Sequence, residues 1–164
     1  RKIAQLSGGM KRRVGIAQAI VGTPEILVVD EPTSGLDPEE RVRFKGVLSR
    51  YAQNGRTVIL STHIVDDIYQ LCGEIAVMRN GKLFYSGEPD GLIQKIENKV
   101  KIIKLESENA LLELQRSSMV LSTTYENNKI IARIVDENNC YMEPSVKATL
   151  EDAYIYSMGG KQHA

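Results

Sequence analysis

The sequence has few cysteines, no excess of charge of either sign and no long apolar run, and each absence excludes a class of protein. Its two cysteines, Cys72 and Cys140, lie far apart and lack metal-ligand spacing, which favours free thiols in a reducing compartment over a disulfide. With 21 Lys and Arg against 21 Asp and Glu, the formal net charge is zero, which argues against nucleic-acid binding by bulk electrostatics. No apolar run approaches the ~20 residues of a membrane-spanning helix, and no signal peptide is visible.

Apolar, β-branched runs alternate with helical patterns up to about residue 86. Ser7 can cap a helix that stops at Gly22, and Asp37-Pro38-Glu39-Glu40 supplies an N-cap, a proline at the first helical position and a carboxylate at the third. This alternation predicts an α/β sheet with its functional residues at the carboxyl ends of the strands. We expect helices over residues 8–21, 38–54 and 64–71, strands buried on both faces over 26–30 and 57–61, and a hairpin over 74–86 with a type I′ turn.

The character of the sequence changes after Gly87, and we place a domain boundary near Asn98. A helix is expected over residues 89–97, and a further strand, helix, hairpin and closing helix predict a small α+β domain over residues 98–164. The charges from Lys99 to Lys104 favour a solvated strand face over a lipid contact. Three tyrosines could line a ligand or dimer surface, but core positions are favoured: Tyr141, Tyr154 and Tyr156.

Asp30 and Glu31 end an apolar strand, in the run "ILVVDEP". A carboxylate at the tip of a buried strand is costly unless its charge is compensated. Magnesium, which takes one or two carboxylates together with phosphate oxygens, would compensate Asp30, and Glu31 could then orient an attacking water. Two solvated acids at a strand end are the alternative that "DE" alone favours.

Two further segments could contact phosphate. Ser7-Gly8-Gly9 opens a helix, where backbone amides and the positive end of the helix dipole favour an anion. His63 follows the strand "TVILS" and could touch a terminal phosphate. A plain N-cap explains the first segment equally well, and a lone histidine at such a junction is more often a cap or a surface residue.

Taken together, "LSGGM", "ILVVDEP", "SGLD" and "STH" resemble, in this order, the signature motif, Walker B, D-loop and H-loop of an ABC-type ATPase, the nucleotide-binding subunit of an ABC transporter. The resemblance is dense to about residue 92, and "PSVKATLEDAYIYSMGG" is similar to the tail of exporter-type members. It implies an α/β fold: part of a P-loop NTPase sheet with flanking helices over residues 1–97, followed by the small α+β domain over residues 98–164.

The resemblance also implies cofactors, ATP and Mg²⁺, and a role for each candidate residue. Asp30 would bind magnesium through water, Glu31 would be the catalytic base, and His63 would contact the γ-phosphate. Ser7, Gly8 and Gly9 would grip ATP bound to the opposite subunit of a homodimer or heterodimer, and Asp37 would cross the interface between the subunits.

The glycine-rich loop of this family, G-x-x-x-x-G-K-[ST], does not occur: none of the thirteen glycines precedes Lys-Ser or Lys-Thr. Because the chain begins at Arg1 directly before a motif, we expect a fragment that does not hydrolyse ATP alone. Without the neighbouring strand of the family's sheet, residues 26–30 and 57–61 would expose an apolar face, and we expect the isolated chain to self-associate through it.

The function implied is the ATP-hydrolysing subunit of an ABC transporter, at the cytoplasmic face of the membrane, driving a partner permease and binding no nucleic acid. Two alternatives stay open. One is a non-transport ABC-type ATPase, which usually carries insertions, tandem cassettes or a basic extension that this chain lacks. The other is a regulatory or binding module without a P-loop that donates "LSGG" in trans.

Overall fold

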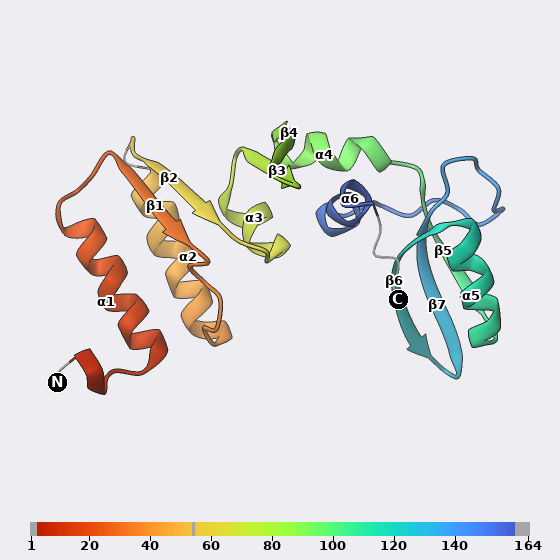
Figure 1. Ribbon diagram of the computed structural model, residues 1–164, viewed down its shortest axis with the longest axis horizontal. Helices are drawn as coiled ribbons and strands as arrows, with labels where there is room; N and C mark the ends of the chain where they lie inside the picture. The colour runs from red at the N-terminus through yellow and green to blue at the C-terminus, as the bar shows by residue number, and fades with distance from the viewer. Residues whose placement is uncertain (1–2, 54, 160–164) are drawn as a thin grey trace. The chain divides into compact units, whose positions relative to one another are not determined.

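The computed structural model describes residues 3–53 and 55–159, and it divides into two compact units, Arg1–Leu71 and Cys72–Ala164. Figure 1 labels the elements along the chain. Within the described residues, every helix is too short or too polar to span a membrane. The two units meet at Leu71 and Cys72, whereas the sequence places a boundary near Asn98. The boundary near Asn98, between the motif-bearing sequence and the accessory domain, stays a prediction.

The first unit is built on two parallel strands. After a short 3₁₀ turn, η1 (Ile3–Gln5), the order is α1 (Gly8–Val21), β1 (Ile26–Asp30), α2 (Pro38–Gln53), β2 (Thr57–Ser61) and α3 (Val65–Leu71). Ser7 caps α1 as expected, accepting a hydrogen bond from the Met10 amide, and α1 ends at Gly22. The register runs from Ile26 opposite Thr57 to Asp30 opposite Ser61, so both strands end at the same edge.

One face of this two-stranded sheet is buried and the other is exposed. Leu27 and Val29 of β1 pack against Phe44, Leu48 and Tyr51 of α2. On the opposite face, the exposed fractions are 58% for Ile26, 70% for Val28 and 53% for Ile59. The expectation that both strands are buried on both faces is therefore wrong for this chain. The expectation of an exposed apolar face is confirmed, because no described element covers it.

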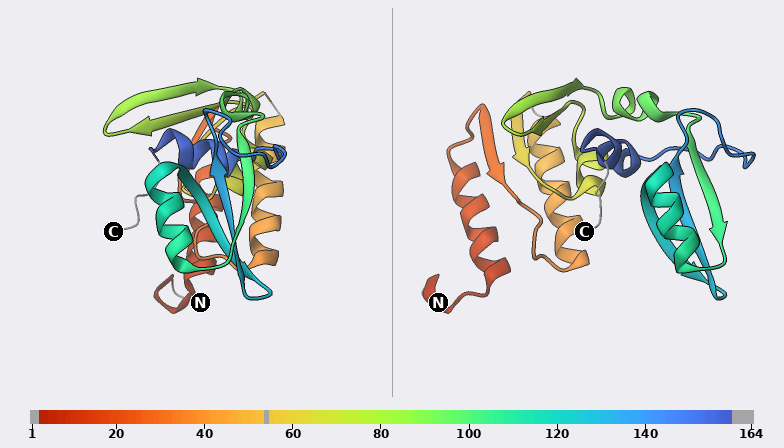
Figure 2. Two further views of the ribbon diagram at one scale, coloured as in Figure 1. Left: turned by 90° about the vertical axis from the view of Figure 1, so that its right-hand side faces the viewer. Right: turned by 45° about the vertical axis from the view of Figure 1, so that its right-hand side comes forward.

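The second unit opens with a hairpin of β3 (Ile75–Arg79) and β4 (Lys82–Gly87), which the left view of Figure 2 shows as a long two-stranded ribbon. Asn80 and Gly81 have φ of 50° and 73°, the left-handed pair that a type I′ turn requires. The predicted hairpin is thus confirmed. The helix expected over residues 89–97 is shorter: α4 covers Pro89–Ile93, and a 3₁₀ turn, η2, covers Gln94–Ile96.

The rest of the unit is a three-stranded antiparallel sheet in the order β5-β7-β6, with two helices. The elements are β5 (Val100–Leu105), α5 (Glu108–Ser117), β6 (Met119–Glu126), β7 (Lys129–Val135) and α6 (Leu150–Ser157). Figures 1 and 2 both show α5 lying along this sheet. Leu111 and Leu114 of α5 pack on Ile103, Ile130 and Ile134 of the strands.

The solvated strand face expected over Lys99 to Lys104 is wrong for Lys101 of β5, which is buried. Its side chain is only 4% exposed and lies 3.0 Å from Asp136, while its ammonium also donates to Asn139 and to the carbonyl of Tyr141. Burial acts to raise the pKa of Asp136, but the amides of Tyr141 and Cys140 and the Lys101 ammonium outweigh it and hold this pKa below its usual value. The loop after β7 therefore encloses a satisfied buried ion pair.

Candidate functional site

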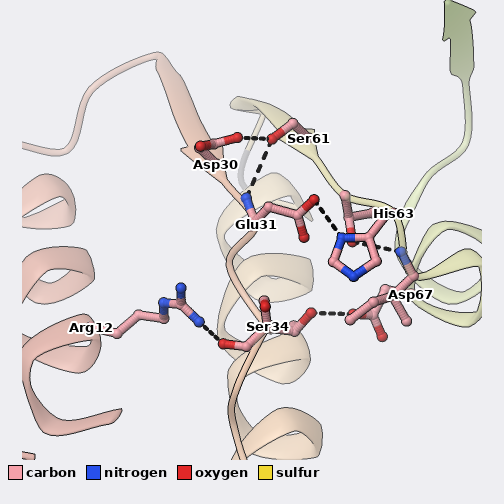
Figure 3. Close-up of polar contacts among 10 residues, drawn as sticks. Arg12, Asp30, Glu31, Ser34, Ser61, His63 and Asp67 are labelled. Atoms are coloured by element: carbon pink, nitrogen blue, oxygen red, sulfur yellow. Dashed lines mark hydrogen bonds and ion pairs between the residues drawn. The ribbon is translucent and has the colours of Figure 1, made fainter. Parts of the chain in front are cut away.

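The carboxyl ends of β1 and β2 bring four polar residues together (Figure 3). Asp30 and Ser61 are the last residues of the two strands and are paired in register, and the Ser61 hydroxyl donates to Oδ1 of Asp30. The next amide, that of Glu31, donates to the Ser61 carbonyl at 3.0 Å and lies 3.3 Å from its hydroxyl oxygen. Parallel pairing thus fixes the Asp30 carboxylate at the strand edge.

The chain turns sharply at Glu31, which has a φ of 43°. A left-handed conformation costs a non-glycine residue about 1–2 kcal/mol, and such outliers are concentrated at functional sites. The turn directs the Glu31 side chain toward His63, whose Nδ1 lies 2.7 Å from Glu31 Oε1. Because an ionised carboxylate can only accept, Nδ1 donates in this contact, and Nε2 is left for another partner.

The second oxygen of Glu31 distinguishes this group from two solvated acids. Among the described residues, Oε2 is buried and has no hydrogen-bond partner. A buried carboxylate oxygen without a donor is costly, so this carboxylate is not a solvated one. His63, in contrast, is 72% exposed, so its ring can reach a ligand.

A buried ionic cluster supports the turn that follows Glu31. Asp67, whose side chain is 1% exposed, accepts from the Thr33 hydroxyl and from Arg41 Nε at 2.8 Å, and it lies 2.6 Å from Lys45 Nζ. Burial acts to raise the pKa of Asp67, but donation from Lys45, Thr33 and Arg41 outweighs it and lowers this pKa below its ordinary value. The cluster ties the turn to α2 and α3.

Ser7, Gly8 and Gly9 form the amino end of α1, separate from the strand-end group. Within the described part of the chain, no hydrogen bond or ion pair joins these three residues to Asp30, Glu31 or His63. A side chain on Gly8 would meet no atom within 4 Å, whereas a Cβ on Gly9 would lie 2.8 Å from Glu40 Oε2. The Gly8 backbone is therefore open to a ligand, and that of Gly9 faces α2.

Two arginines hold α1 against the segment between β1 and α2. Arg12 donates to the carbonyl of Ser34, and Arg13 pairs with Glu40. Asp37 caps α2 by accepting from the Glu40 amide at 2.8 Å, which confirms the expected N-cap. Whether Asp37 also crosses a subunit interface stays a prediction.

Asp30 and Ser61 could supply only part of the ligands of a magnesium ion. The described residues contain no cluster of three or more His, Cys, Asp or Glu side chains able to enclose a metal ion. Asp30 with the Ser61 hydroxyl offers one carboxylate and one neutral oxygen, which fits an ion that keeps several waters and takes further oxygens from a phosphate. Asp30 and Ser61 would hold it, and the nucleotide would supply the remaining ligands.

Sequence reasoning found Asp30, Glu31 and His63, which the structure brings together, and it missed Ser61 and the Asp67 cluster. Ser61 had a signal, because "ILVVD" and "TVILS" have equal lengths and parallel pairing places their last residues side by side. Arg41 and Lys45 are four apart on one helix face, but that spacing alone did not identify Asp67 as their common acceptor.

Comparison with known proteins agrees with these motifs. The ABC transporter family matches residues 1–34. The chain is 39% identical over 95 residues to the Nod factor export ATP-binding protein I of Neorhizobium galegae, which covers 58% of this chain and 27% of that protein. It is 41% identical over 100 residues to the protein of the same name from Rhizobium sp. (strain N33), covering 57% of this chain and 31% of the relative.

Over 57–58% of its length the chain is thus similar to ABC transporter ATP-binding proteins. A solved structure described as the ATP-binding subunit of an ABC transporter superimposes with a TM-score of 0.53 at 29% identity, covering 57% of this chain and 39% of that one. The mixed α/β fold expected over part of the chain is thereby confirmed. The chain spans about three-tenths of the length of the curated relatives that it matches.

Proposed function

We propose that the chain is part of the ATP-hydrolysing subunit of an ABC transporter, which pairs with a second ATPase subunit and drives a permease from the cytoplasmic face of the membrane. The observation that carries this proposal is the 2.7 Å contact between Glu31 and His63, beside the Asp30–Ser61 pair, at the edge where two parallel strands end. Bound phosphate at this edge would meet a carboxylate, an imidazole and the oxygens suited to magnesium.

In this proposal Glu31 is the general base that accepts a proton from the attacking water. Oε1 is held by His63 Nδ1, and Oε2, which has no hydrogen-bond partner among the described residues, would accept from that water once bound nucleotide exposes it. With both ring nitrogens protonated, Nε2 of His63 would donate to the γ-phosphate while Nδ1 donates to Glu31. Magnesium, when bound near Asp30, would offset the negative charge of the phosphates.

Ser7, Gly8 and Gly9 would serve the nucleotide of the opposite subunit. Their separation from the strand-end group agrees with a site completed by two chains. The open Gly8 backbone and the N-terminal amides of α1 suit a phosphate oxygen. Asp37, at the start of α2, would lie near the same interface.

The relatives named above are Nod factor export ATP-binding proteins. Their name supports the proposal that the subunit to which this chain belongs powers export. The permease is proposed as a partner because the family works through one. The full activity would need the glycine-rich nucleotide loop that this chain does not contain.

The first experiment is a titration of the purified chain with a fluorescent ATP analogue and magnesium, with phosphate release followed in parallel. We expect no binding below millimolar nucleotide and no turnover, because the chain has no loop to cradle the phosphates. Micromolar binding would contradict this and would indicate a complete phosphate site within these residues. In the full-length subunit, micromolar binding and turnover are expected, and their absence would contradict the proposal itself.

A further inference from the structure

One edge of the three-stranded sheet in the second unit is open. β6 is the outer strand beside β7, and the two lie side by side in Figure 1. Its last five residues, Ser122 to Glu126, are all exposed. They contain no proline and no lysine, the residues that usually protect an edge strand against pairing with another chain.

The other edge of the sheet is covered at one end. Beside β5, Lys101 forms a bridge with Ser145, and the Val146 amide donates to the Val100 carbonyl at 2.8 Å. These contacts prevent a further strand from joining at that end of β5. No described segment pairs with the outer side of β6 over Ser122 to Glu126, which leaves this stretch available for pairing.

The turn between β6 and β7 determines which backbone groups of β6 point outward. Asn127 and Asn128, with φ of 48° and 65°, form a two-residue turn that pairs Glu126 with Lys129. Residues flanking such a turn exchange hydrogen bonds, and the pattern alternates along the strand. Thr124 therefore bonds to β7, whereas the N–H and C=O groups of Thr123 and Tyr125 point away from the sheet.

This edge is complementary to itself. Antiparallel pairing of two copies about Thr124 sets Thr123 of each copy opposite Tyr125 of the other, which satisfies all the outward groups of both residues. Glu126 then meets Ser122 of the second copy, so no like charges face each other. Within each copy Glu126 stays opposite Lys129 of β7, so the carboxylate keeps a cation as its neighbour across the hairpin.

We infer that β6 is a docking edge for a second copy of this chain, which would join two three-stranded sheets into one of six strands. The occupant is a second copy because one register satisfies the outward backbone groups of both partners and brings no like charges together. The contact lies outside the strand-end site and does not depend on the proposed ATPase activity.

Disulfide trapping tests the register directly. In a chain carrying Cys72→Ser and Cys140→Ser, a cysteine at position 124 would face its own counterpart as a non-hydrogen-bonded pair, whose Cα atoms lie about 4.5 Å apart. This distance is compatible with a disulfide, so Thr124→Cys should give covalent dimer roughly tenfold faster than Ser122→Cys. An equimolar mixture of Ser122→Cys and Glu126→Cys chains should give mostly the mixed dimer.

Equal trapping at positions 122 and 124, or no trapping at either, would overturn the inference, because exposure alone would then account for the reactivity. Thr123→Pro, which removes an outward N–H group, should abolish trapping through position 124. Thr123→Val keeps that group and is the matched control. Circular dichroism of each variant verifies that the sheet is folded, and trapping that survives Thr123→Pro in a folded chain contradicts the pairing.

Discussion

Nδ1 of His63 lies 2.7 Å from Oε1 of Glu31, across the ends of two parallel strands. Each residue follows its strand closely, and the left-handed turn at Glu31 brings the two side chains into contact. The pair leaves one buried carboxylate oxygen and one exposed imidazole nitrogen for other partners. Such an arrangement would let Glu31 act as a base on a water while His63 contacts the phosphate that the water attacks.

Glu31→Gln is expected to lower ATP hydrolysis by the full-length subunit by about 10²–10⁴-fold, because the amide cannot accept the proton of the attacking water. Binding of ATP should persist, since Glu31 is proposed to act on water. The measurement is phosphate release at saturating ATP, beside a separate binding titration. Glu39→Gln, which alters an exposed acid paired only with Arg43, should leave turnover unchanged. A Glu31→Gln subunit with normal turnover would exclude Glu31 as the base.

The two signature glycines should respond differently to alanine. Gly8→Ala adds a methyl group where no atom lies within 4 Å, and it should stabilise the fold by about 0.4–1 kcal/mol because alanine restricts the unfolded chain. Gly9→Ala should gain less, because its Cβ would displace the Glu40 carboxylate that pairs with Arg13. Urea unfolding followed by circular dichroism measures both. In a Glu40→Ala background the two substitutions should become equivalent, and a difference that persists there would show that Glu40 is not the cause.

Only the part of this site that depends on local sequence patterns was predictable. Asp30, Glu31 and His63 each follow an apolar strand, so their meeting at one sheet edge was predictable from parallel pairing. The burial of Asp67 was not, because it depends on α3 packing against α2, and no local spacing reports that contact. For the same reason Lys101 read as a surface residue: only the fold of the loop after β7 supplies Asp136 and Asn139 as its partners.

Asp67→Asn is expected to lower the free energy of unfolding of the first unit by about 3 kcal/mol, since it leaves Arg41 and Lys45 beside a neutral, buried amide. The measurement is again urea unfolding. Asp66→Asn is the matched control, because Asp66 is the adjacent residue on α3 and is exposed. If both variants lost equal stability, general loss of charge on α3, and not the buried cluster, would explain the effect.

Stability should fall as the solution is acidified below pH 4. Burial acts to raise the pKa values of Asp67 and Asp152, but hydrogen bonds and nearby cations outweigh it and lower both. An aspartate with a lowered pKa in the folded state contributes stability above the unfolded-state value of 3.8, and this contribution is lost as pH falls through the folded-state value. Urea unfolding at a series of pH values from 7 to 2 tests this. In the Asp67→Asn variant the decline should be shallower, and an unchanged slope would exclude Asp67 as a contributor.

The bounds of the helices and strands were more predictable than the burial of their side chains. Caps and turn residues such as Ser7 and the Asn80-Gly81 pair act through their own backbone, so they appear where the sequence places them. The burial of Val28 depends instead on whether another element covers its face of the sheet. An apolar, β-branched run indicates a strand, but it does not reveal which segments are present to pack on it.

That exposed face leads to the last prediction, that the isolated chain self-associates through Ile26, Val28 and Ile59. Val28→Ser should weaken association at micromolar concentration, because it removes apolar surface from the centre of the patch. Val42→Ser is the matched control: Val42 on α2 is 71% exposed and Val28 is 70% exposed, so both changes remove a similar amount of exposed apolar surface. Light scattering across a concentration series measures the mass. A monomeric mass for the unmodified chain throughout that range, or equal effects of the two substitutions, would contradict the prediction.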